Sequence, residues 1–539
     1  MKADLTRDTF HPWKHFDRVL MQQGRVQLDA DWNEQAEILL RYVQKLTLDL
    51  IGRTAGPTPP SGQIPGFVIS KLSGVANDLR IGFGDYFVDG LLCEADFMPI
   101  AISQPSAAGV CQVINWSPDF DQTPIPPFEV YDDTPGTPNL PVVVTVTVGA
   151  GQKAHSQITI APTFSNFTNP KLRRLITYLH QPDFVYNTTA NAVSPPPLPA
   201  TPGVYQIYLD VWDRVITYAE DDSIREVALG GPDTAVRTKR VWQVKWAQPP
   251  AGTPACSLPF LYGTLQPPNR GWMMAMAKQA NPSTDPCIIN PNASYTGPEN
   301  QLYRVEINRF GGPWNGNDPA DQTAATFKWS RENGSAIYPI ASGGGTAMVV
   351  VDSLGRDDRF GLDEGNLVEV QDDRTVLMNL AGNLLTVQGI DPSTLTVSLG
   401  GAPDPNTGSN LSWHPLLRRW DQTAGDPAEG GLTLANDNCA FVQEGQWLEL
   451  EDGVQVWFKP ALGAATNQYR TGDYWLIPAR TATGDVEWPT ITDAQGNSTP
   501  LALPPHGVTH HYAPLATLNV NPDGMAVTDC PGFDTGQDT

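Results

Sequence analysis

The stretch GFVISKLSGVANDLRIGFGDYFVDGLLCEA, residues 66–95, indicates the class of the fold. Its short runs of alternating apolar and polar residues are divided by Gly and by Asn-Asp, a pattern typical of β-strands joined by tight turns. The same pattern continues through most of the chain after Gly52, most strongly at residues 204–217, 224–246, 300–308, 325–340 and 473–480. The sequence therefore predicts a mainly β protein made of several β-sandwich or barrel-like modules.

Two short stretches have the composition of hairpin turns. Asp452-Gly453 lies between the alternating runs QWLELE and VQVWF, and Asp-Gly is a strong hairpin signal. SGGGT, residues 342–346, lacks the Gly-Lys-Ser/Thr ending of a phosphate-binding loop, and no helical pattern follows it. We expect a hairpin tip at each place.

The N-terminal segment VLMQQGRVQLDADWNEQAEILLRYVQ, residues 19–44, changes its period half-way. It opens with weak alternation around Gly24, which predicts a short strand, a turn and a second strand. From Asp31 onward, apolar residues recur at the spacing of a helix. These are Trp32, Ala36, Leu39, Leu40, Val43, Leu46 and Leu50. We expect one helix of about five turns with a single apolar stripe.

Three acidic residues stand where this helix is expected to begin. Asp31 as N-cap and Glu34 three residues later fit a capping box, and Asp29 adds negative charge at the positive end of the helix dipole. An acid–base pair or a metal site is the alternative. The cap is favoured because no His or third ligand lies nearby in the sequence.

The chain is long enough for several domains. Residues 102–169 are less regular and contain PVVVTVTVGAGQKAHSQITIAP, two strand runs about a Gly-Ala-Gly turn, so we expect an inserted β-domain there. A short helix is expected within 171–179. The predicted organisation is a helical docking arm (1–55), a small β module (56–101), the inserted β-domain (102–169), a central β domain (170–345), a C-terminal β domain (346–520) and a flexible tail (521–539).

Charge excludes two classes of partner. The chain has 34 Lys and Arg against 58 Asp and Glu, a net charge of -24, which repels nucleic acid and anionic membrane surfaces. No apolar run is long enough to insert in a membrane, and the first residues, MKADLTRDTFHPWKHF, lack the apolar region of a secretion signal. We expect folding in the cytoplasm.

The six cysteines form no C-x-x-C pair and are scattered, which suits a reducing compartment. They are Cys93, Cys111, Cys256, Cys287, Cys439 and Cys530. The sequence leaves open whether Cys256 and Cys287 form a disulfide bridge.

PHGVTHHYAP, residues 505–514, is a further candidate for a metal site, through His506, His510 and His511. Its prolines favour a loop, and the H-E-x-x-H pattern is absent. Hydrogen-bonded loop histidines are the favoured interpretation, so we expect no metal and no cofactor.

Two acidic stretches are weak candidates for an enzymatic site or a calcium site. WNGNDPADQT, residues 314–323, lacks the ligand order of an EF-hand and is expected to form a turn. VDSLGRDDRFGLDEGN, residues 351–366, holds four aspartates that would suit glycoside hydrolysis only at the right separation. They are Asp352, Asp357, Asp358 and Asp363. Because Arg356 and Arg359 lie between them, an ion-paired surface loop is favoured. We expect no enzyme.

Tryptophans that lie in or beside the expected strands have two interpretations. They are Trp212, Trp242, Trp246, Trp329, Trp420, Trp457 and Trp475. Core packing is the first, and stacking on sugars, which requires exposed rings, is the second.

RDTFHPWKHFDRVLMQQGRVQLDADWNEQ, residues 7–35, resembles the N-terminal signature of an uncharacterised bacterial domain family. Its members occur in cyanobacteria and actinobacteria and are often encoded with phage-tail-like contractile injection systems. The resemblance continues in YLDVWDRVIT (208–217), IREVALGGPDTAVRTKRVWQVKW (224–246), NQLYRVEIN (300–308), ATFKWSRENGS (325–335), HPLLRRWD (414–421) and HGVTHHYAPLATL (506–518).

The resemblance implies a structural subunit of such a particle, at the baseplate or another accessory position. Its partners would be other particle subunits in a symmetric multi-copy assembly, made in the cytoplasm and released or membrane-associated with the particle. We expect the arm to dock through Phe10, Phe16, Trp32, Leu39, Val43 and Leu46. The alternatives are a carbohydrate-binding or carbohydrate-degrading β protein and, third, a toxin cargo.

Overall fold

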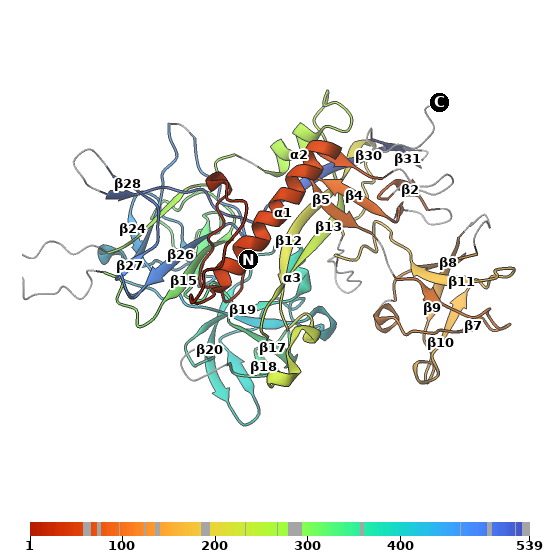
Figure 1. The fold of residues 1–539 in the computed structure, drawn as a ribbon, viewed down its shortest axis with the longest axis horizontal. Helices are drawn as coiled ribbons and strands as arrows, with labels where there is room; N and C mark the ends of the chain where they lie inside the picture. Colours follow the sequence, from red (N-terminus) through yellow and green to blue (C-terminus); the bar gives the residue numbers. More distant parts are fainter. Residues whose placement is uncertain are drawn as a thin grey trace, which may run out of the picture. The chain divides into compact units, whose positions relative to one another are not determined.

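The computed structural model describes residues 1–57, 66–72, 77–95, 98–122, 125–134, 141–184, 195–231, 233–266, 268–278, 294–355, 361–463, 465–492, 498–522 and 524–530. The fold is mainly β, as predicted (Figure 1). The chain divides into two compact units. Unit 1 comprises Met1–Val43, Trp212–Arg240 and Tyr262–Thr509, and unit 2 comprises Gln44–Val211, Val241–Leu261 and His510–Thr539.

The predicted N-terminal helix is present as α1 (Asp29–Ile51). The other helices are short: α2 (Leu258–Leu265), α3 (Asp373–Leu377) and the 3-10 turns η1 (Pro12–Lys14), η2 (Pro118–Asp121), η3 (Lys153–His155), η4 (Asp222–Ile224), η5 (Val227–Leu229), η6 (Leu411–Trp413) and η7 (Pro427–Glu429). The strand–turn–strand predicted before α1 is wrong, since residues 19–28 contain a turn at 23–24 but no strand. Leu20 and Val26 are exposed there, so no core fixes a strand pair.

Unit 1 contains two sheets around one hydrophobic core. Their strand orders are β23-β16-β15-β26-β27 and β14-β25-β24. The strands are β14 (Met273–Ala277), β15 (Gln301–Arg309), β16 (Thr326–Ser330), β23 (Ala440–Phe441), β24 (Trp447–Glu449), β25 (Val454–Phe458), β26 (Tyr474–Arg480) and β27 (Asp485–Val486). Asp452-Gly453 forms the predicted hairpin turn between β24 and β25, with a positive φ at both residues.

A closed barrel with its own core also belongs to unit 1, in the order β17-β18-β21-β20-β19-β22. Its strands are β17 (Ile337–Ser342), β18 (Met348–Val351), β19 (Leu367–Gln371), β20 (Leu384–Asp391), β21 (Thr396–Leu399) and β22 (Leu416–Trp420). The SGGGT stretch is the tip of the β17–β18 hairpin, as predicted. A small hairpin, β28 (Thr490–Thr492) with β29 (Ser498–Pro500), also lies in this unit.

The barrel interrupts a sheet in sequence, because β16 precedes it, β23 follows it, and the two strands pair. Likewise β14 pairs with β25 and β15 with β26. The expected boundary at 345/346 therefore does not separate two domains. Pairing between strands more than a hundred residues apart leaves no local signal in the sequence.

In unit 2, a four-stranded sheet β13-β12-β30-β31 shares one core with two smaller sheets, β1-β4-β5 and β2-β3. The strands are β1 (Thr54–Ala55), β2 (Ile69–Lys71), β3 (Leu79–Ile81), β4 (Asp85–Val88), β5 (Leu91–Glu94), β12 (Gly203–Ile216), β13 (Arg237–Ala247), β30 (His511–Asn521) and β31 (Gly524–Asp529). The expected flexible tail over 521–539 is wrong where β31 pairs with β30. Residues 531–539 lie outside the described residues.

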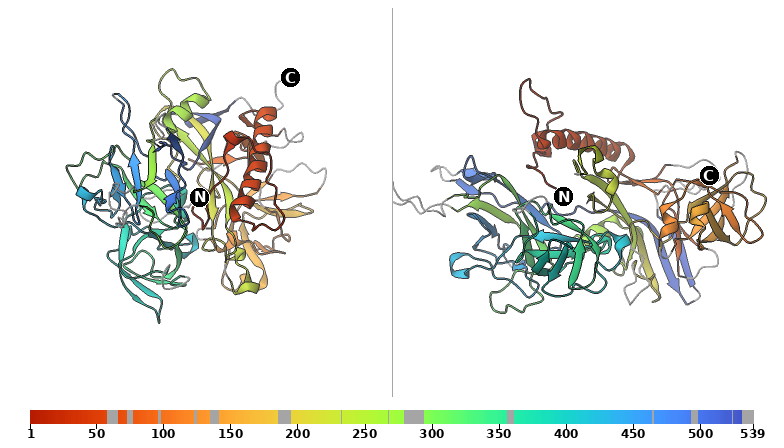
Figure 2. Two further views of the ribbon diagram at one scale, coloured as in Figure 1. Left: turned by 60° about the vertical axis from the view of Figure 1, so that its left-hand side comes forward. Right: turned by 90° about the horizontal axis from the view of Figure 1, so that it is seen from below.

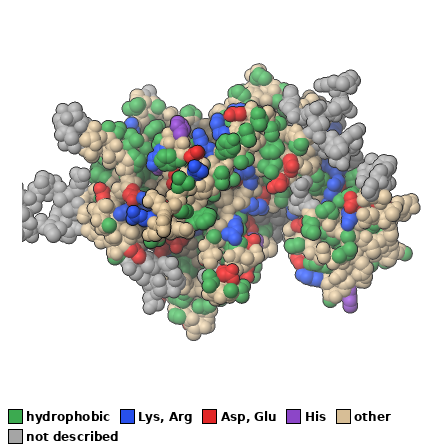
Figure 3. Space-filling view, viewed as in Figure 1, with side chains coloured by type: hydrophobic (Ala, Val, Ile, Leu, Met, Phe, Trp, Pro, Cys, Tyr) green, Lys and Arg blue, Asp and Glu red, His purple; other side chains and the backbone are tan. Residues whose placement is uncertain are grey.

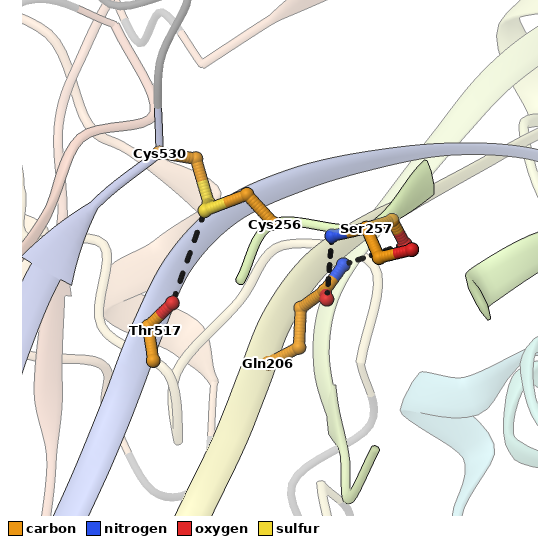
Figure 4. Close-up of a disulfide and its surroundings, with 5 residues drawn as sticks. All are labelled: Gln206, Cys256, Ser257, Thr517 and Cys530. Atoms are coloured by element: carbon orange, nitrogen blue, oxygen red, sulfur yellow. Dashed lines mark hydrogen bonds between the residues drawn. A yellow bond between two sulfur atoms is a disulfide. The ribbon is translucent and has the colours of Figure 1, made fainter. Parts of the chain in front are cut away.

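A disulfide joins Cys256 to Cys530 across 274 residues (Figure 4). It lies beside β30 and β12, where the Ser257 amide donates a 3.1 Å hydrogen bond to Gln206. The bridge considered between Cys256 and Cys287 is therefore wrong for Cys256, and Cys287 lies outside the described residues. The cross-link joins the residues just before α2 to the end of β31 in the four-stranded sheet.

Residues between β6 (Ile100–Ala101) and β11 (Pro170–Arg174) form a six-stranded sheet with a separate core, in the order β6-β11-β8-β9-β10-β7. Its other strands are β7 (Val110–Gln112), β8 (Phe128–Asp132), β9 (Val142–Thr147) and β10 (Gln157–Ala161). The helix expected within 171–179 is wrong, because Leu172 is buried in this core and β11 pairs with β8.

Candidate interaction surface

Helix α1 turns its apolar side outward. Apart from small residues, only Ile38 is a buried hydrophobic side chain in its 23 residues. We call the stripe formed by Trp32, Ala36, Leu39, Val43, Leu46 and Leu50 the outer face, and all six residues are exposed. Leu40, Tyr42 and Ile51 are exposed as well. Hydrophobic side chains gather over the band where α1 lies (Figure 3). A helix on a folded body normally buries such a stripe, so this arrangement is inverted.

Polar contacts hold the N-terminal end of the helix. The Thr6 amide donates a 2.8 Å hydrogen bond to the Asp29 carboxylate, which also accepts from the Thr6 hydroxyl. The Thr9 hydroxyl donates to Glu34 at 2.7 Å. Burial acts to raise the pKa of Asp29, but the bonds from Thr6 outweigh it and the pKa lies below its usual value. Two of the three predicted cap acids therefore fasten α1 to the preceding segment.

The capping prediction is wrong in its register. Asp31 is the third residue of α1, and its carboxylate accepts a 3.4 Å hydrogen bond from the Leu28 amide. Asp31 is therefore the acid that reaches back to the amide before the helix, the role predicted for Glu34. The cap lies three residues earlier in the sequence than predicted. The helix extends back to Asp29 because Thr6, distant in sequence, satisfies the Asp29 side chain.

In unit 2, the C-terminal part of α1 lies on the turn between β4 and β5. The Gln44 side chain donates a 3.1 Å hydrogen bond to the Asp89 carbonyl. Gly90 has a positive φ of 79°, and a Cβ there would lie 2.2 Å from the Gln44 carbonyl oxygen. Only glycine allows this close approach. Neither this contact nor the contact of Thr6 with α1 was predicted from the sequence, although the Asp-Gly pair that forms the turn can be read from it.

The residues before α1, which we call the leading segment (residues 13–28), are also rich in exposed apolar side chains. They are Trp13, Phe16, Leu20, Met21, Val26 and Leu28. The segment extends as a loop from the N-terminal end of the helix (Figure 2, right). The Val19 amide donates a 2.8 Å hydrogen bond to Gln35, which ties the loop to one flank of α1. Among the predicted docking residues, only Phe10 is partly buried.

The first residues of the chain are anchored in unit 1. The Asn333 side chain donates to the carbonyls of Met1 and Ala3 at 3.0 and 2.8 Å. Lys2 forms a 2.8 Å ion pair with Glu306. Burial lowers the pKa of Lys2 to about 8, although Glu306 acts to raise it. The arm is therefore fixed at its start as well as along α1.

A polar cavity of about 350 Å³ lies beside the Thr6–Asp29 contact in unit 1. Its charged lining residues are Asp4, Asp29, Glu299, Glu332 and Arg480. Arg480 donates to the Thr6 carbonyl at 3.0 Å and forms an ion pair with Glu487. Its guanidinium therefore already supports the arm, and the cavity is better explained as part of that anchorage than as a ligand pocket.

The three candidate histidines are not brought together. His506, in unit 1, stacks on Tyr474, and burial lowers its pKa. In unit 2, His510 Nδ1 lies 2.6 Å from Asp210 and His511 Nδ1 lies 3.0 Å from Asp89. Within the described ranges, no three His, Cys, Asp or Glu residues are grouped to bind a metal.

The acidic stretches form local turns where they are described. The amide of Thr323 donates to Asp321 at 2.7 Å and that of Ala320 to Asp318 at 2.8 Å, so these carboxylates close the predicted turn. Residues 356–360, which include Asp357, Asp358, Arg356 and Arg359, lie outside the described residues. No helix in the described part of the chain is both long and apolar enough to cross a membrane.

Core packing accounts for most of the selected tryptophans. Trp212, Trp242, Trp329, Trp420 and Trp475 are buried, and Trp246 and Trp457 are partly buried.

The chain matches the family of unknown function DUF6519 over residues 1–114, 175–253 and 269–535. It belongs to this family. The match includes the leading segment and all of α1, whereas residues 115–174, which contain β8 to β11, lie outside it. No curated protein and no solved structure matches the chain. The arm thus belongs to the part that DUF6519 shares, and most of the six-stranded sheet does not.

Proposed function

We propose that this DUF6519 protein is a structural subunit of a phage-tail-like contractile injection particle, attached at the baseplate or another accessory position through its N-terminal arm. The observation that carries the proposal is the inverted helix α1, whose apolar stripe is exposed. The resemblance of residues 7–35 to proteins encoded with such particles supplies the kind of partner.

The exposed apolar area is large enough to drive docking. Burying one large apolar side chain contributes about 1.5–3 kcal/mol, and the outer face and leading segment together expose eleven of them. Even partial burial of this set offsets the roughly 4–15 kcal/mol of lost translational and rotational freedom on association. An isolated soluble protein rarely exposes so much apolar surface without a partner.

The arm is also held ready for binding. Contacts of Thr6, Thr9 and Gln44 fix α1 before any partner is present. A surface that is already ordered loses less conformational entropy when it docks. In a symmetric particle each copy would meet the same neighbours, so one arm geometry would serve all positions.

The burial of the tryptophan side chains gives little support to the alternative of a carbohydrate-binding or carbohydrate-degrading protein. Most of the tryptophans it needs at the surface are buried in cores. Of the described tryptophans, Trp13, Trp32 and Trp272 are exposed, and the two most exposed, Trp13 and Trp32, lie in the arm.

The test compares two double variants in particles purified from the host. Leu20→Glu with Val26→Glu places charge on the leading segment, at side chains that are 69% and 83% exposed. The matched control, Val227→Glu with Leu462→Glu, makes the same change at side chains of unit 1 that are 84% and 82% exposed. Neither pair alters a buried residue, so both variants should fold.

We expect the arm variant to be depleted from particles at least tenfold, measured by quantitative mass spectrometry, and the control to be retained. Depletion of both variants, or of neither, would contradict docking through the arm.

A further inference from the structure

The outer face of α1 has the spacing of a coiled-coil seam. Its six residues follow one another at intervals of four, three, four, three and four positions. Any two successive intervals add up to seven residues, which is the repeat of heptad positions a and d. Trp32, Leu39 and Leu46 then occupy d, and Ala36, Val43 and Leu50 occupy a.

The opposite side of the helix confirms the orientation of the seam. Glu34 and Gln44, whose side chains bond within units 1 and 2, fall on positions f and b, away from the a and d stripe. Asp29 lies seven residues before Ala36 and falls on position a, at the N-terminal end of the helix before the seam begins. Ile38, the buried apolar residue, falls on position c. The seam is thus a free face of a helix that is already formed and fixed.

The residues that flank the seam indicate the occupant. Positions e and g hold Asn33, Gln35, Leu40, Tyr42, Thr47 and Asp49, so a single charge borders the seam. Charged residues at e and g are what select a different partner helix in coiled coils. In α1 the e and g positions hold almost no charged residues that could select a different partner helix. They also avoid the like-charge repulsion that a chain of net charge -24 would otherwise meet on pairing with itself.

We propose that the seam of α1 pairs with α1 of a second copy of this chain, so that the protein is a dimer before it joins any particle. The seam spans 19 residues, about 27 Å of helix. A free peptide of that length would be a marginal coiled coil. In this protein the helix is preformed, so pairing does not have to offset the cost of helix nucleation.

This inference deepens the proposed function by dividing the arm into two parts. The seam joins copies, and the exposed side chains of the leading segment remain available to other subunits. Dimerisation is a property of the purified chain, whereas incorporation is a property of the particle, so each idea can fail alone.

The experiment is sedimentation of the purified full-length chain at concentrations around the micromolar range. The natural sequence should sediment as a dimer. Leu39→Glu with Leu46→Glu, both at d positions, should shift at least tenfold more of the protein to monomer. Arg41→Glu with Lys45→Glu adds more negative charge to exposed positions of the same helix, off the seam, and should remain dimeric. Raising the salt concentration should strengthen the dimer, because it screens the net repulsion.

A cysteine cross-link keeps the test valid if the glutamate variant misfolds. The cysteines Cys93, Cys111 and Cys439 are buried, and the unsubstituted chain, oxidised in parallel, is the control for cross-links through any other thiol. On oxidation, Val43→Cys should give a covalent dimer for parallel helices, and Ala36→Cys with Leu46→Cys for antiparallel helices. A monomeric natural chain, a dimer that survives the glutamates at d, or no covalent dimer from either cysteine variant would overturn the proposal.

Discussion

The Gln44 side chain donates a 3.1 Å hydrogen bond to the carbonyl of Asp89, and the next residue, Gly90, lies so close to α1 that a Cβ there would meet the Gln44 backbone at 2.2 Å. The β4–β5 turn therefore holds α1 from its polar side. This contact and the Thr6–Asp29 bond at the other end of the helix fix α1, and the apolar stripe stays exposed.

Gly90→Ala should weaken this support. The new methyl group overlaps the Gln44 carbonyl at a positive φ, so we expect a loss of about 1–3 kcal/mol in the free energy of unfolding. Gly151→Ala is the control, because Gly151 has nearly the same φ, 80°, with no atom within 4 Å of a Cβ. Hydrogen exchange along 44–51 should rise in the first variant alone. Equal effects of the two substitutions would show that backbone strain, rather than the contact with α1, matters.

The predictable part of α1 was its period, and the unpredictable part was its orientation. The spacing of Trp32, Leu39 and Val43 is compatible with a buried stripe or an exposed one. The contacts that hold the polar side of the helix come from Thr9 and Asp89, which no local pattern links to the helix. The cap acids were found in the right place but in the wrong register, for the same reason.

Strands were predictable from alternation, while their partners were not. β15 and β26 appear in the sequence at 300–308 and 473–480, yet only the fold shows that they pair. The Cys256–Cys530 bridge joins residues 274 positions apart and follows from the pairing of β31 with β30. Spacing between cysteines carried no signal for it.

The six-stranded sheet should be removable. Ala101 of β6 and Lys171 of β11 are paired, so their Cα atoms lie about 5 Å apart and a short linker can join them. Replacing 102–170 also removes Glu129, which forms a 2.9 Å ion pair with Arg80, so the deletion should be combined with Arg80→Gln. We expect the melting temperature of the remaining chain to change by no more than a few degrees, measured by calorimetry. Loss of cooperative unfolding would show that the rest of unit 2 depends on this sheet.

A buried ion pair joins the barrel to the five-stranded sheet of unit 1. Lys328 on β16 lies 2.6 Å from Glu369 on β19, and both side chains are almost fully buried. Lys328→Met leaves Glu369 buried without its cation, so we expect a loss of about 3–5 kcal/mol. Lys153→Met, which breaks an exposed pair with Asp121 at 2.7 Å, should leave the denaturation midpoint unchanged. Adding Glu369→Gln to Lys328→Met should recover part of the loss, and its failure to do so would argue against the unpaired charge as the cause.

Acid should weaken unit 1 through His506. Burial lowers the pKa of this ring, so the unfolded chain binds a proton at a higher pH than the folded chain. The free energy of unfolding is therefore greatest above about pH 6.5 and falls as the pH drops from there towards the lower pKa of the folded state. His506→Asn should flatten this slope in denaturant titrations between about pH 8 and 5. His414→Asn should do the opposite, because a hydrogen bond to Asp373 raises the pKa of His414. An unchanged slope in His506→Asn would contradict the assignment.

The most direct measurement of the central claim is cryo-electron microscopy of native contractile particles from the host, with mass spectrometry to identify this chain. We predict ordered, symmetric density for the chain, with the leading segment seated on another particle subunit and the outer face of α1 covered. Particles that lack the chain, or density in which both surfaces face solvent, would contradict docking through the arm.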